Sequence, residues 1–341
     1  AENVVGPLFD DAVKGKTLPR LVEGVAVGAD DIPNIIKPSI CGLIEVSRGC
    51  GRGCDFCSPT LLRFRCRSIQ DVVAEAKVNV NAGKSSVILH SEDVFRYKAR
   101  GVHPNPAAVE ELFRSVCSVE GVKTVHVSHG CFASILSAPK MLHSISEIMK
   151  LGRRNWRAYE VGLETGSPRL VRGHMEGKCK PFKPEEWPEV VKQATGISND
   201  AYWVPVSTLV MGLPGEGPDD VTKTLELIDD LEDYRIMFYP LFFVPIGRLS
   251  GEDYFTKEKM LPEHFELFFK CWEINLRQWP RIFSNLSVKY NFVERAFAKL
   301  LLSRGVSVSL RAIRESMENL RTGKPFWIGR NKFQMPAVLT A

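Results

Sequence analysis

The chain has 341 residues, a hydrophobic content of 44% and a formal net charge of +5. This length suits one large barrel-type domain or two ordinary domains, and the composition is that of a globular protein. No apolar stretch approaches the ~20 residues of a bilayer span, and no secretory signal begins the chain. We therefore expect a cytoplasmic protein whose nine cysteines are reduced thiols or metal ligands rather than a disulfide framework.

The positive charge is concentrated at the end of the chain. Residues 301–341 contain seven Lys or Arg and two acids, which gives this segment a charge of +5 and leaves the remainder about neutral. Such a tail is typical of a solvated helix face, or of a surface that meets an acidic partner, nucleic acid or anionic lipid.

Strand-like runs alternate with helical patterns from residue 41 onward. The expected strands are residues 43–47, 86–90, 124–128, 158–163, 204–211 and 236–244. The expected helices are residues 69–82 with Ser68 as N-cap, 106–116, 138–149, 185–195 with Gly196 as the stop, and 219–231. Strands separated by helices pair in parallel through right-handed crossovers.

The alternation predicts an α/β fold, a partial (βα)6 TIM-type barrel, over residues 41–250. A doubly wound open sheet is the alternative, although no G-x-G-x-x-G follows the first strand. Residues 1–40 are rich in glycine and proline and are expected to form an extended lead-in. Residues 251–341 are expected to be a mostly helical C-terminal region.

Three cysteines follow the first expected strand in a C-x3-C-x2-C pattern, namely Cys50, Cys54 and Cys57. Three thiolates on one glycine-rich loop can hold three irons of a [4Fe–4S] cluster and leave the fourth iron open to another ligand. A redox C-x-x-C or half of a zinc site are the alternatives. Neither alternative accounts for all three cysteines. A redox pair leaves Cys50 without a role, and a zinc site lacks its remaining ligands because no second C-x2-C or histidine pair follows.

Polar or glycine-rich residues also follow three later strands. The second strand is followed by Ser91, Glu92 and Asp93, the fourth by Glu164 and Ser167, and the fifth by Gly212, Gly215 and Glu216. In a barrel these loops lie on one face, together with the cysteine loop. Adjacent acids there would suit an ammonium group, Glu164 and Ser167 sugar hydroxyls, and the glycines the close approach of a flat ring.

With these motifs, the chain resembles the radical S-adenosylmethionine superfamily over roughly residues 40–245. The resemblance implies that the three cysteines bind a [4Fe–4S] cluster whose open iron is chelated by the amino and carboxylate groups of S-adenosylmethionine. By position, residues 91–93 would hold the amino group, Glu164 and Ser167 would lie near the ribose and carboxylate, and residues 212–216 would lie under the adenine. Phe56 would contribute a backbone contact near the adenine edge.

A narrower resemblance is to the cobalamin-binding branch of that superfamily and to its archaeal members. It depends on Ser47-Arg48-Gly49-Cys50, Arg65-Cys66-Arg67-Ser68, Glu92-Asp93-Val94-Phe95 and the turns at 164–167 and 213–216. Cobalamin is therefore a possible further cofactor. No Asp-x-His-x-x-Gly of a cobalamin domain is evident, and residues 1–28 resemble only the last segment and linker of such a domain.

The resemblance implies reductive cleavage of S-adenosylmethionine to a 5′-deoxyadenosyl radical that abstracts hydrogen from a substrate, for methylation, C–C bond formation or other radical chemistry. The implied partners are a low-potential electron donor of ferredoxin or flavodoxin type and a small-molecule, lipid or peptide substrate. We expect no nucleic-acid partner.

Two other classes of protein stay open. One is an iron–sulfur electron-transfer or binding protein without S-adenosylmethionine chemistry, and the other is a zinc-stabilised nucleic-acid-binding protein that uses the basic tail. The six remaining cysteines are expected to be buried thiols, with Cys131 and Cys179 the best candidates for further ligands.

Overall fold

The computed structural model describes residues 5–17, 27–283, 292–322, 324, 326–328 and 331–333. Its strands are β1 (Leu43–Glu45), β2 (Ser47–Arg48), β3 (Arg65–Cys66), β4 (Ser86–His90), β5 (Thr124–Val127), β6 (His129–Gly130), β7 (Arg157–Glu164), β8 (Trp203–Met211), β9 (Met237–Phe242), β10 (Phe326–Ile328) and β11 (Asn331–Phe333). Its α-helices are α1 (Val5–Val13), α2 (Ile69–Asn81), α3 (Pro106–Cys117), α4 (Phe132–Ser137), α5 (Pro139–Ile148), α6 (Pro168–His174), α7 (Glu176–Cys179), α8 (Trp187–Asp200), α9 (Pro218–Leu231), α10 (Pro262–Phe283) and α11 (Phe292–Arg321).

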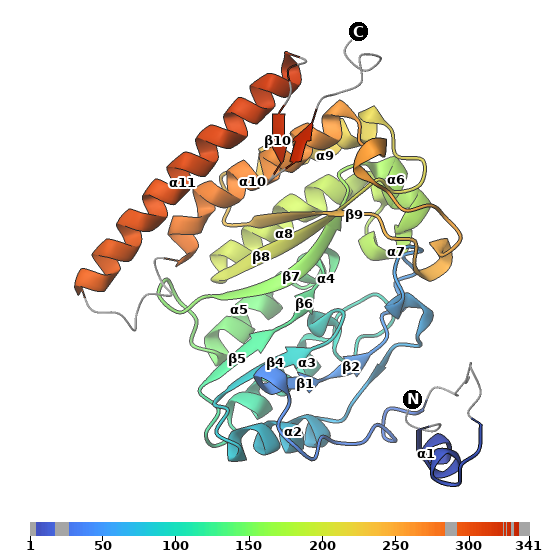
Figure 1. The fold of residues 1–341 in the computed structure, drawn as a ribbon. Coiled ribbons are helices and arrows are strands. Elements are labelled where there is room, and N and C mark those ends of the chain that lie inside the picture. Colours follow the sequence, from blue (N-terminus) through green and yellow to red (C-terminus); the bar gives the residue numbers. More distant parts are fainter. Residues whose placement is uncertain are drawn as a thin grey trace.

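The central strands pair in parallel in chain order, as the alternation predicts. One group runs β1-β4-β5 and the next runs β6-β7-β8-β9. Ser128 joins the groups, because its N–H donates to the Leu89 carbonyl at 2.9 Å and its carbonyl accepts from Glu160 N–H at 2.8 Å. Figure 1 shows the strands following one another from β1 at the bottom to β9 near the top. The predicted partial barrel is confirmed.

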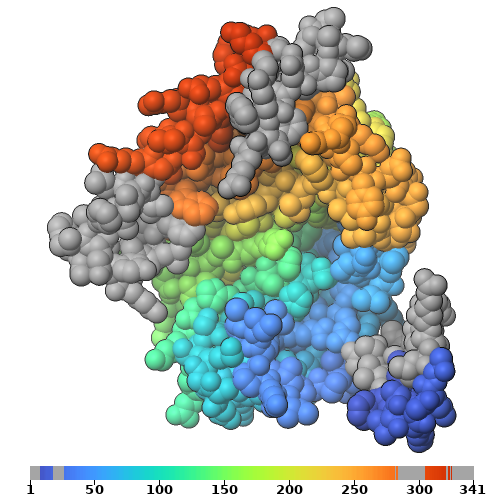
Figure 2. Space-filling view, in the orientation of Figure 1, coloured from blue at the N-terminus to red at the C-terminus, as the bar shows by residue number. Residues whose placement is uncertain are grey.

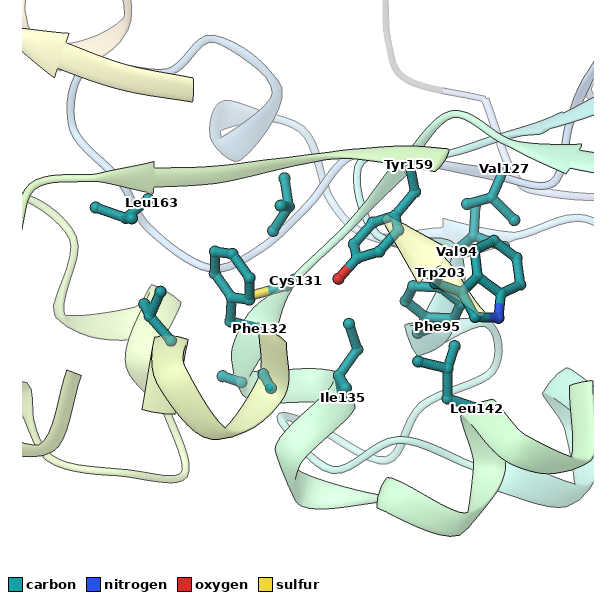
Figure 3. Packing of buried hydrophobic residues seen from close by; sticks show 14 of the residues in the cluster. Val94, Phe95, Val127, Cys131, Phe132, Ile135, Leu142, Tyr159, Leu163 and Trp203 are labelled. Atoms are coloured by element: carbon teal, nitrogen blue, oxygen red, sulfur yellow. The ribbon is translucent and has the colours of Figure 1, made fainter. Parts of the chain in front are cut away.

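Helices cover one face of this sheet and bury its apolar side chains. Phe95, Tyr159 and Trp203 are fully buried there (Figure 3). Their rings meet edge to face, with centroids 5.6 Å apart for Phe95 and Tyr159 and 6.0 Å apart for Tyr159 and Trp203. Each such side chain contributes on the order of 2 kcal/mol through burial. The core therefore holds the helices against the sheet and leaves the opposite face for binding.

Helix α8 ends later than predicted, and four α-helices were not predicted. Ser68 caps α2 as expected, accepting from Asp71 N–H at 3.1 Å. Gly196 does not end α8, which continues to Asp200. The extra turn is held by tertiary contacts, since the Ser198 hydroxyl lies 2.9 Å from the Tyr159 hydroxyl. The short helices α4, α6 and α7 were not predicted, and α1 lies within residues 1–40, which were expected to be extended.

The free edge of β9 is covered by α10. The side-chain amide of Asn275 accepts from Phe238 N–H at 2.8 Å and donates to the Phe238 carbonyl at 2.6 Å, as a neighbouring strand would. Exposed strand edges otherwise promote association with other chains. The described part of the C-terminal region is largely helical, and α10 and α11 lie side by side in Figure 1. The domain limits at residues 40 and 250 stay predictions.

Among the residues that the structure describes, no helix combines the length and the apolar character needed to cross a membrane.

Candidate functional site

The three predicted cysteine ligands lie on the long loop between β2 and β3. Cys54 is buried, with 7% of its surface exposed, and Cys50 and Cys57 are half-buried. The loop folds on itself through Cys50 N–H, which donates to the Pro59 carbonyl at 3.3 Å. Gly49 has φ of 76°, and a Cβ there would lie 2.6 Å from two carbonyl oxygens of residues 62 and 63. Only glycine therefore fits at this turn.

Burial raises the pKa of all three thiols, to about 12 for Cys54. Neighbouring thiolates raise the pKa values of Cys54 and Cys57 further, and the ammonium of Lys178 lowers both. Such thiols hold their protons at neutral pH until a cationic centre displaces them. Clustered thiols of this kind are a suitable donor set for iron.

A cluster and a single ion make different demands on the cysteines. Among the described residues, no three His, Cys, Asp or Glu side chains are grouped closely enough to hold one metal ion. A [4Fe–4S] cube spreads its thiolates over different irons, so its ligands need not converge on one point. The cradle of loop glycines and the three partly buried thiols fit such a cube.

A buried ion pair fixes the cysteine loop in place. Arg52, between the first two ligands, pairs with Asp93 at 3.0 Å, and the two side chains are 4% and 3% exposed. Arg52 also donates to the Ser134 hydroxyl at 2.7 Å and to the Lys178 carbonyl at 3.0 Å. One side chain thereby joins the loop to the end of β4, to α4 and to α7. The sequence analysis missed this role, for which an arginine between two ligand cysteines was the only signal.

The residues after β4 have separate roles. Asp93, expected to bind an ammonium group, already has Arg52 as its cation. Ser91 is buried, and its hydroxyl lies 2.5 Å from that of Ser47. Glu92 is half-buried and has no hydrogen-bond or ion-pair partner among the described residues. Its negative charge contributes to raising the pKa of Cys57.

Glu164, at the end of β7, forms an ion pair with Lys178 of α7. Glu164 has φ of 65°, in the left-handed region that side chains rarely adopt. Burial lowers the pKa of Lys178, but the charges of Glu164 and Cys54 outweigh it and raise the pKa overall. The charge of this buried cation in turn lowers the pKa of Cys54 and Cys57. The sequence analysis did not identify Lys178, because its partners are distant in the chain.

Ser167 is a fully buried helix cap. Its hydroxyl donates to Asp220 at 2.5 Å and accepts from Leu170 N–H at 3.5 Å at the start of α6. These contacts join α6 to α9. In the described structure the Ser167 side chain is therefore already hydrogen-bonded to Asp220 and Leu170.

The glycine turn after β8 lies beside the cysteine loop. His174 connects the two, lying 3.0 Å from the Asp55 carboxylate and 2.9 Å from the Pro214 carbonyl. Phe56 packs against Leu213 in a small apolar cluster. The structure thus brings the second and third cysteines next to this turn, as the sequence predicts for loops on one barrel face.

Within that turn, Gly212 and Gly215 both have positive φ, of 83° and 79°. The Glu216 carboxylate accepts from Gly212 N–H at 2.5 Å and lies 2.9 Å from His264 Nε2. It is 4% exposed and serves to close the turn. A Cβ on Gly215 would meet open space, so this glycine borders solvent.

A cavity of about 780 Å³ lies on the sheet face opposite the helices. Its lining includes His90, His126, His129 and Glu160, and His90 directly precedes Ser91 and Glu92. His129 Nε2 lies 3.3 Å from the Glu160 carboxylate, and His90 Nδ1 lies 3.0 Å from the Ser128 hydroxyl. The face seen in Figure 2 is hollowed where blue and green segments meet.

The other candidate cysteines are ordinary buried thiols. Cys131 Sγ lies 3.7 Å from the Lys178 carbonyl, and Cys179 Sγ lies 3.0 Å from the Glu176 carbonyl. Both are buried within the main core.

Replacing Gly177 by alanine is expected to disturb the cysteine loop. A Cβ there would lie 1.7 Å from the Arg52 carbonyl oxygen, which real contacts do not allow. We expect a loss of about 1–3 kcal/mol in the free energy of unfolding and lower iron content. Gly173→Ala is the matched control, since nothing lies within 4 Å of its Cβ and alanine favours the helix. Equal unfolding curves for the two variants would contradict the close packing of α7 on the loop.

Several known proteins resemble this chain in sequence. The family model of the Radical SAM superfamily matches residues 44–228. The ribosomal protein uS12 methylthiotransferase RimO of Pseudothermotoga lettingae is 29% identical over 230 residues, covering 65% of this chain and 48% of the relative. The tRNA-2-methylthio-N(6)-dimethylallyladenosine synthase of Clostridium tetani is 25% identical over 252 residues, covering 72% and 49%.

Among solved structures, the radical S-adenosylmethionine methyltransferase TsrM of Kitasatospora setae, with cobalamin and a [4Fe–4S] cluster bound, is 17% identical with a TM-score of 0.44. The match covers 58% of this chain and 36% of that one. The chain spans about half the length of the curated relatives it matches. Since the family model covers more than half of its residues, the chain belongs to the radical S-adenosylmethionine superfamily, whose members use a [4Fe–4S] cluster and S-adenosylmethionine.

Proposed function

We propose that this chain binds a [4Fe–4S] cluster through Cys50, Cys54 and Cys57 and cleaves S-adenosylmethionine reductively to methionine and a 5′-deoxyadenosyl radical. The observation that carries the proposal is the placement of Glu92. Glu92 is an unpartnered carboxylate next to Asp93, on a turn that the Arg52–Asp93 pair holds to the cysteine loop, and its charge acts on the Cys57 thiol. An electron-transfer protein needs three or four cysteines but no such free carboxylate.

Glu92 is the group best suited to the α-ammonium of S-adenosylmethionine. Asp93 and Ser91 then act as positioning residues that fix the turn. Lys178, held by Glu164 near Cys54, offers a cation to the carboxylate of the same ligand. A carboxylate and an ammonium group at these two positions would orient the zwitterionic end of the molecule.

The adenosine end would lie toward the turn after β8. Phe56 and Leu213 supply an apolar wall, and the backbone at Gly215 is open to close approach of a flat ring, whereas the Phe255 ring already covers Gly212. Ser167 and Glu216 stabilise the neighbouring backbone, because Ser167 hydrogen-bonds to Asp220 and Glu216 contacts His264. The assignment of these residues to the ribose and adenine stays a proposal.

When bound, the cluster supplies the electron that breaks the sulfonium C–S bond. The protein then has to keep water from the radical and hold the substrate near it. The cavity of about 780 Å³ on the open sheet face is the proposed substrate chamber, because its lining includes His90, which directly precedes Ser91 and Glu92. The His129–Glu160 pair there can bind a polar group of a small-molecule, lipid or peptide substrate.

The electron itself comes from outside the chain. Clusters of this type lie toward the reducing end of a range of about −700 to +450 mV, so we propose a ferredoxin- or flavodoxin-type donor. Methyl transfer with cobalamin is one outcome of such a radical, and hydrogen abstraction with rearrangement or coupling is another.

The anaerobically reconstituted protein, mixed with dithionite and S-adenosylmethionine, is expected to release methionine and 5′-deoxyadenosine. Glu92→Gln should raise the KM for S-adenosylmethionine by roughly ten-fold or more, because a charge-assisted hydrogen bond contributes about 1.5–3 kcal/mol. Glu120→Gln, an exposed glutamate on a distant turn, is the matched control. A fully loaded cluster without 5′-deoxyadenosine would instead support an electron-transfer protein.

A further inference from the structure

Two basic segments lie against each other on the outer side of the first cysteine. Residues 63–66 end the cysteine loop and form β3, and residues 96–103 follow the turn after β4. Lys98 N–H donates to Cys66 Sγ at 3.1 Å, and the Arg96 guanidinium lies 4.9 Å from the centre of the Phe64 ring. These contacts make one continuous surface from two parts of the chain.

The surface carries an excess of positive charge. Arg63, Lys98 and Arg100 are exposed and Arg65 is half-buried. None of the four forms an ion pair with an acid among the described residues, and Arg65 donates instead to the Arg63 carbonyl at 3.1 Å. We call these four residues the cationic patch. Because residues 1–300 are about neutral as a whole, the patch is a local concentration of positive charge and not part of a uniformly basic surface.

A single buried side chain connects the patch to the cluster loop. Arg96, which is 5% exposed, donates to the Cys50 carbonyl at 3.0 Å and to the Gly101 carbonyl at 2.8 Å. Gly101 adjoins Arg100 of the patch, and Cys50 is a proposed iron ligand. A protein resting on the patch would therefore lie close to the cluster, separated from it by Arg96 and the loop backbone.

We propose that the cationic patch is the docking surface for a low-potential electron-donor protein with an acidic face, of flavodoxin type. The inference rests on the proposed function, which requires one electron per cleavage. On docking, the reduced donor loses one electron and the oxidised cluster gains it, with no bond made or broken. Complementary charge steers such encounters and raises association rates by about 10- to 1,000-fold at low salt.

A nucleic-acid strand fits the same surface less well. Single-stranded nucleic acid is usually held by cations interleaved with exposed aromatic rings. Here the Phe64 ring is covered by Arg96, and Tyr97 is fully buried with Lys98 lying 5.5 Å from its ring centre. The patch offers charge without a stacking platform, which suits a folded acidic partner.

The test compares a protein donor with a small one. The triple variant Arg63→Glu, Lys98→Glu, Arg100→Glu is reconstituted with its cluster. It is then mixed in a stopped-flow instrument with either photoreduced flavodoxin or dithionite. Loss of absorbance at ~400 nm reports reduction of the cluster. We expect the flavodoxin rate to fall at least ~10-fold at low ionic strength and the dithionite rate to stay unchanged. The control Lys77→Glu, Lys140→Glu, Lys223→Glu changes three exposed lysines on α2, α5 and α9 and should retain both rates.

Cluster reduction is read without S-adenosylmethionine, so the docking surface and the proposed function fail separately. Absence of 5′-deoxyadenosine with dithionite would overturn the function alone. Equal flavodoxin rates in wild type and variant, or equal losses in the two triple variants, would overturn the docking surface. Filter binding of poly(U) lost only in the patch variant, with flavodoxin rates unchanged, would assign the patch to nucleic acid instead. If the patch variant loads less iron, the wild-type protein provides a second test: its rate of cluster reduction by flavodoxin must fall steeply with added salt.

Discussion

Cys54→Ser is expected to abolish cluster binding and with it all cleavage of S-adenosylmethionine. Cys54 is the most buried of the three proposed ligands, and burial together with its neighbours raises its thiol pKa to about 12. Serine has a far higher pKa and is a poor ligand for iron at neutral pH. We expect the iron content to fall from ~4 atoms per chain to well below one atom per chain, and the absorbance at ~400 nm to disappear. Iron analysis and anaerobic spectra measure both.

The matched control is Cys117→Ser, because Cys117 is half-buried on α3 and lies outside the cysteine loop. This variant should load iron and release 5′-deoxyadenosine as the wild type does. Retention of a full complement of iron and sulfide by Cys54→Ser would refute the assignment of the loop. Zinc without iron in the wild type would favour the zinc-stabilised class of protein.

The second large effect is expected for Arg52→Met, which removes the buried cation from the cysteine loop. Asp93 would remain buried with no partner cation, and four further hydrogen bonds of the guanidinium would be lost. Breaking a buried pair from one side costs about 3–5 kcal/mol. We expect the free energy of unfolding to fall by that amount and the loop to load little iron, as measured by denaturant titration and iron analysis.

A second substitution separates lost charge pairing from lost packing. Arg52→Met with Asp93→Asn leaves no unpaired buried charge and should recover part of the lost stability, although the cluster loading should stay low. Arg63→Met, at an exposed arginine of the same loop, should lie within about 0.5 kcal/mol of the wild type. An Arg52→Met variant as stable as Arg63→Met would show that the buried pair does not anchor the loop.

The recurrence of strands and helices was readable from the sequence because hydrophobic period and capping are local signals. Ser68 caps α2 as expected, since both partners lie within one turn. The end of α8 was misplaced because Gly196 is outweighed by contacts from Ser198 to Tyr159, a residue on another element. Local propensity is weak beside such tertiary contacts.

In the candidate site, too, features set by nearby residues were predictable and features set by distant contacts were not. The spacing of Cys50, Cys54 and Cys57 indicated a cluster loop, because ligands that are near in sequence must be near in space. The acids after β4 looked equivalent in the sequence, yet in the structure Asp93 is bound by Arg52 and Glu92 is free. That difference depends on a contact across 41 positions of the chain.

By itself, then, the sequence determined the fold class and the superfamily and predicted the cysteine ligands, all of which rest on short-range patterns. Only the tertiary structure decided which polar groups are free to bind a ligand. Glu164 is bound to Lys178, Ser167 to Asp220, and Glu216 to its own turn. The physical reason is that a buried polar group must find a partner, and the folded chain brings that partner from elements distant in the sequence.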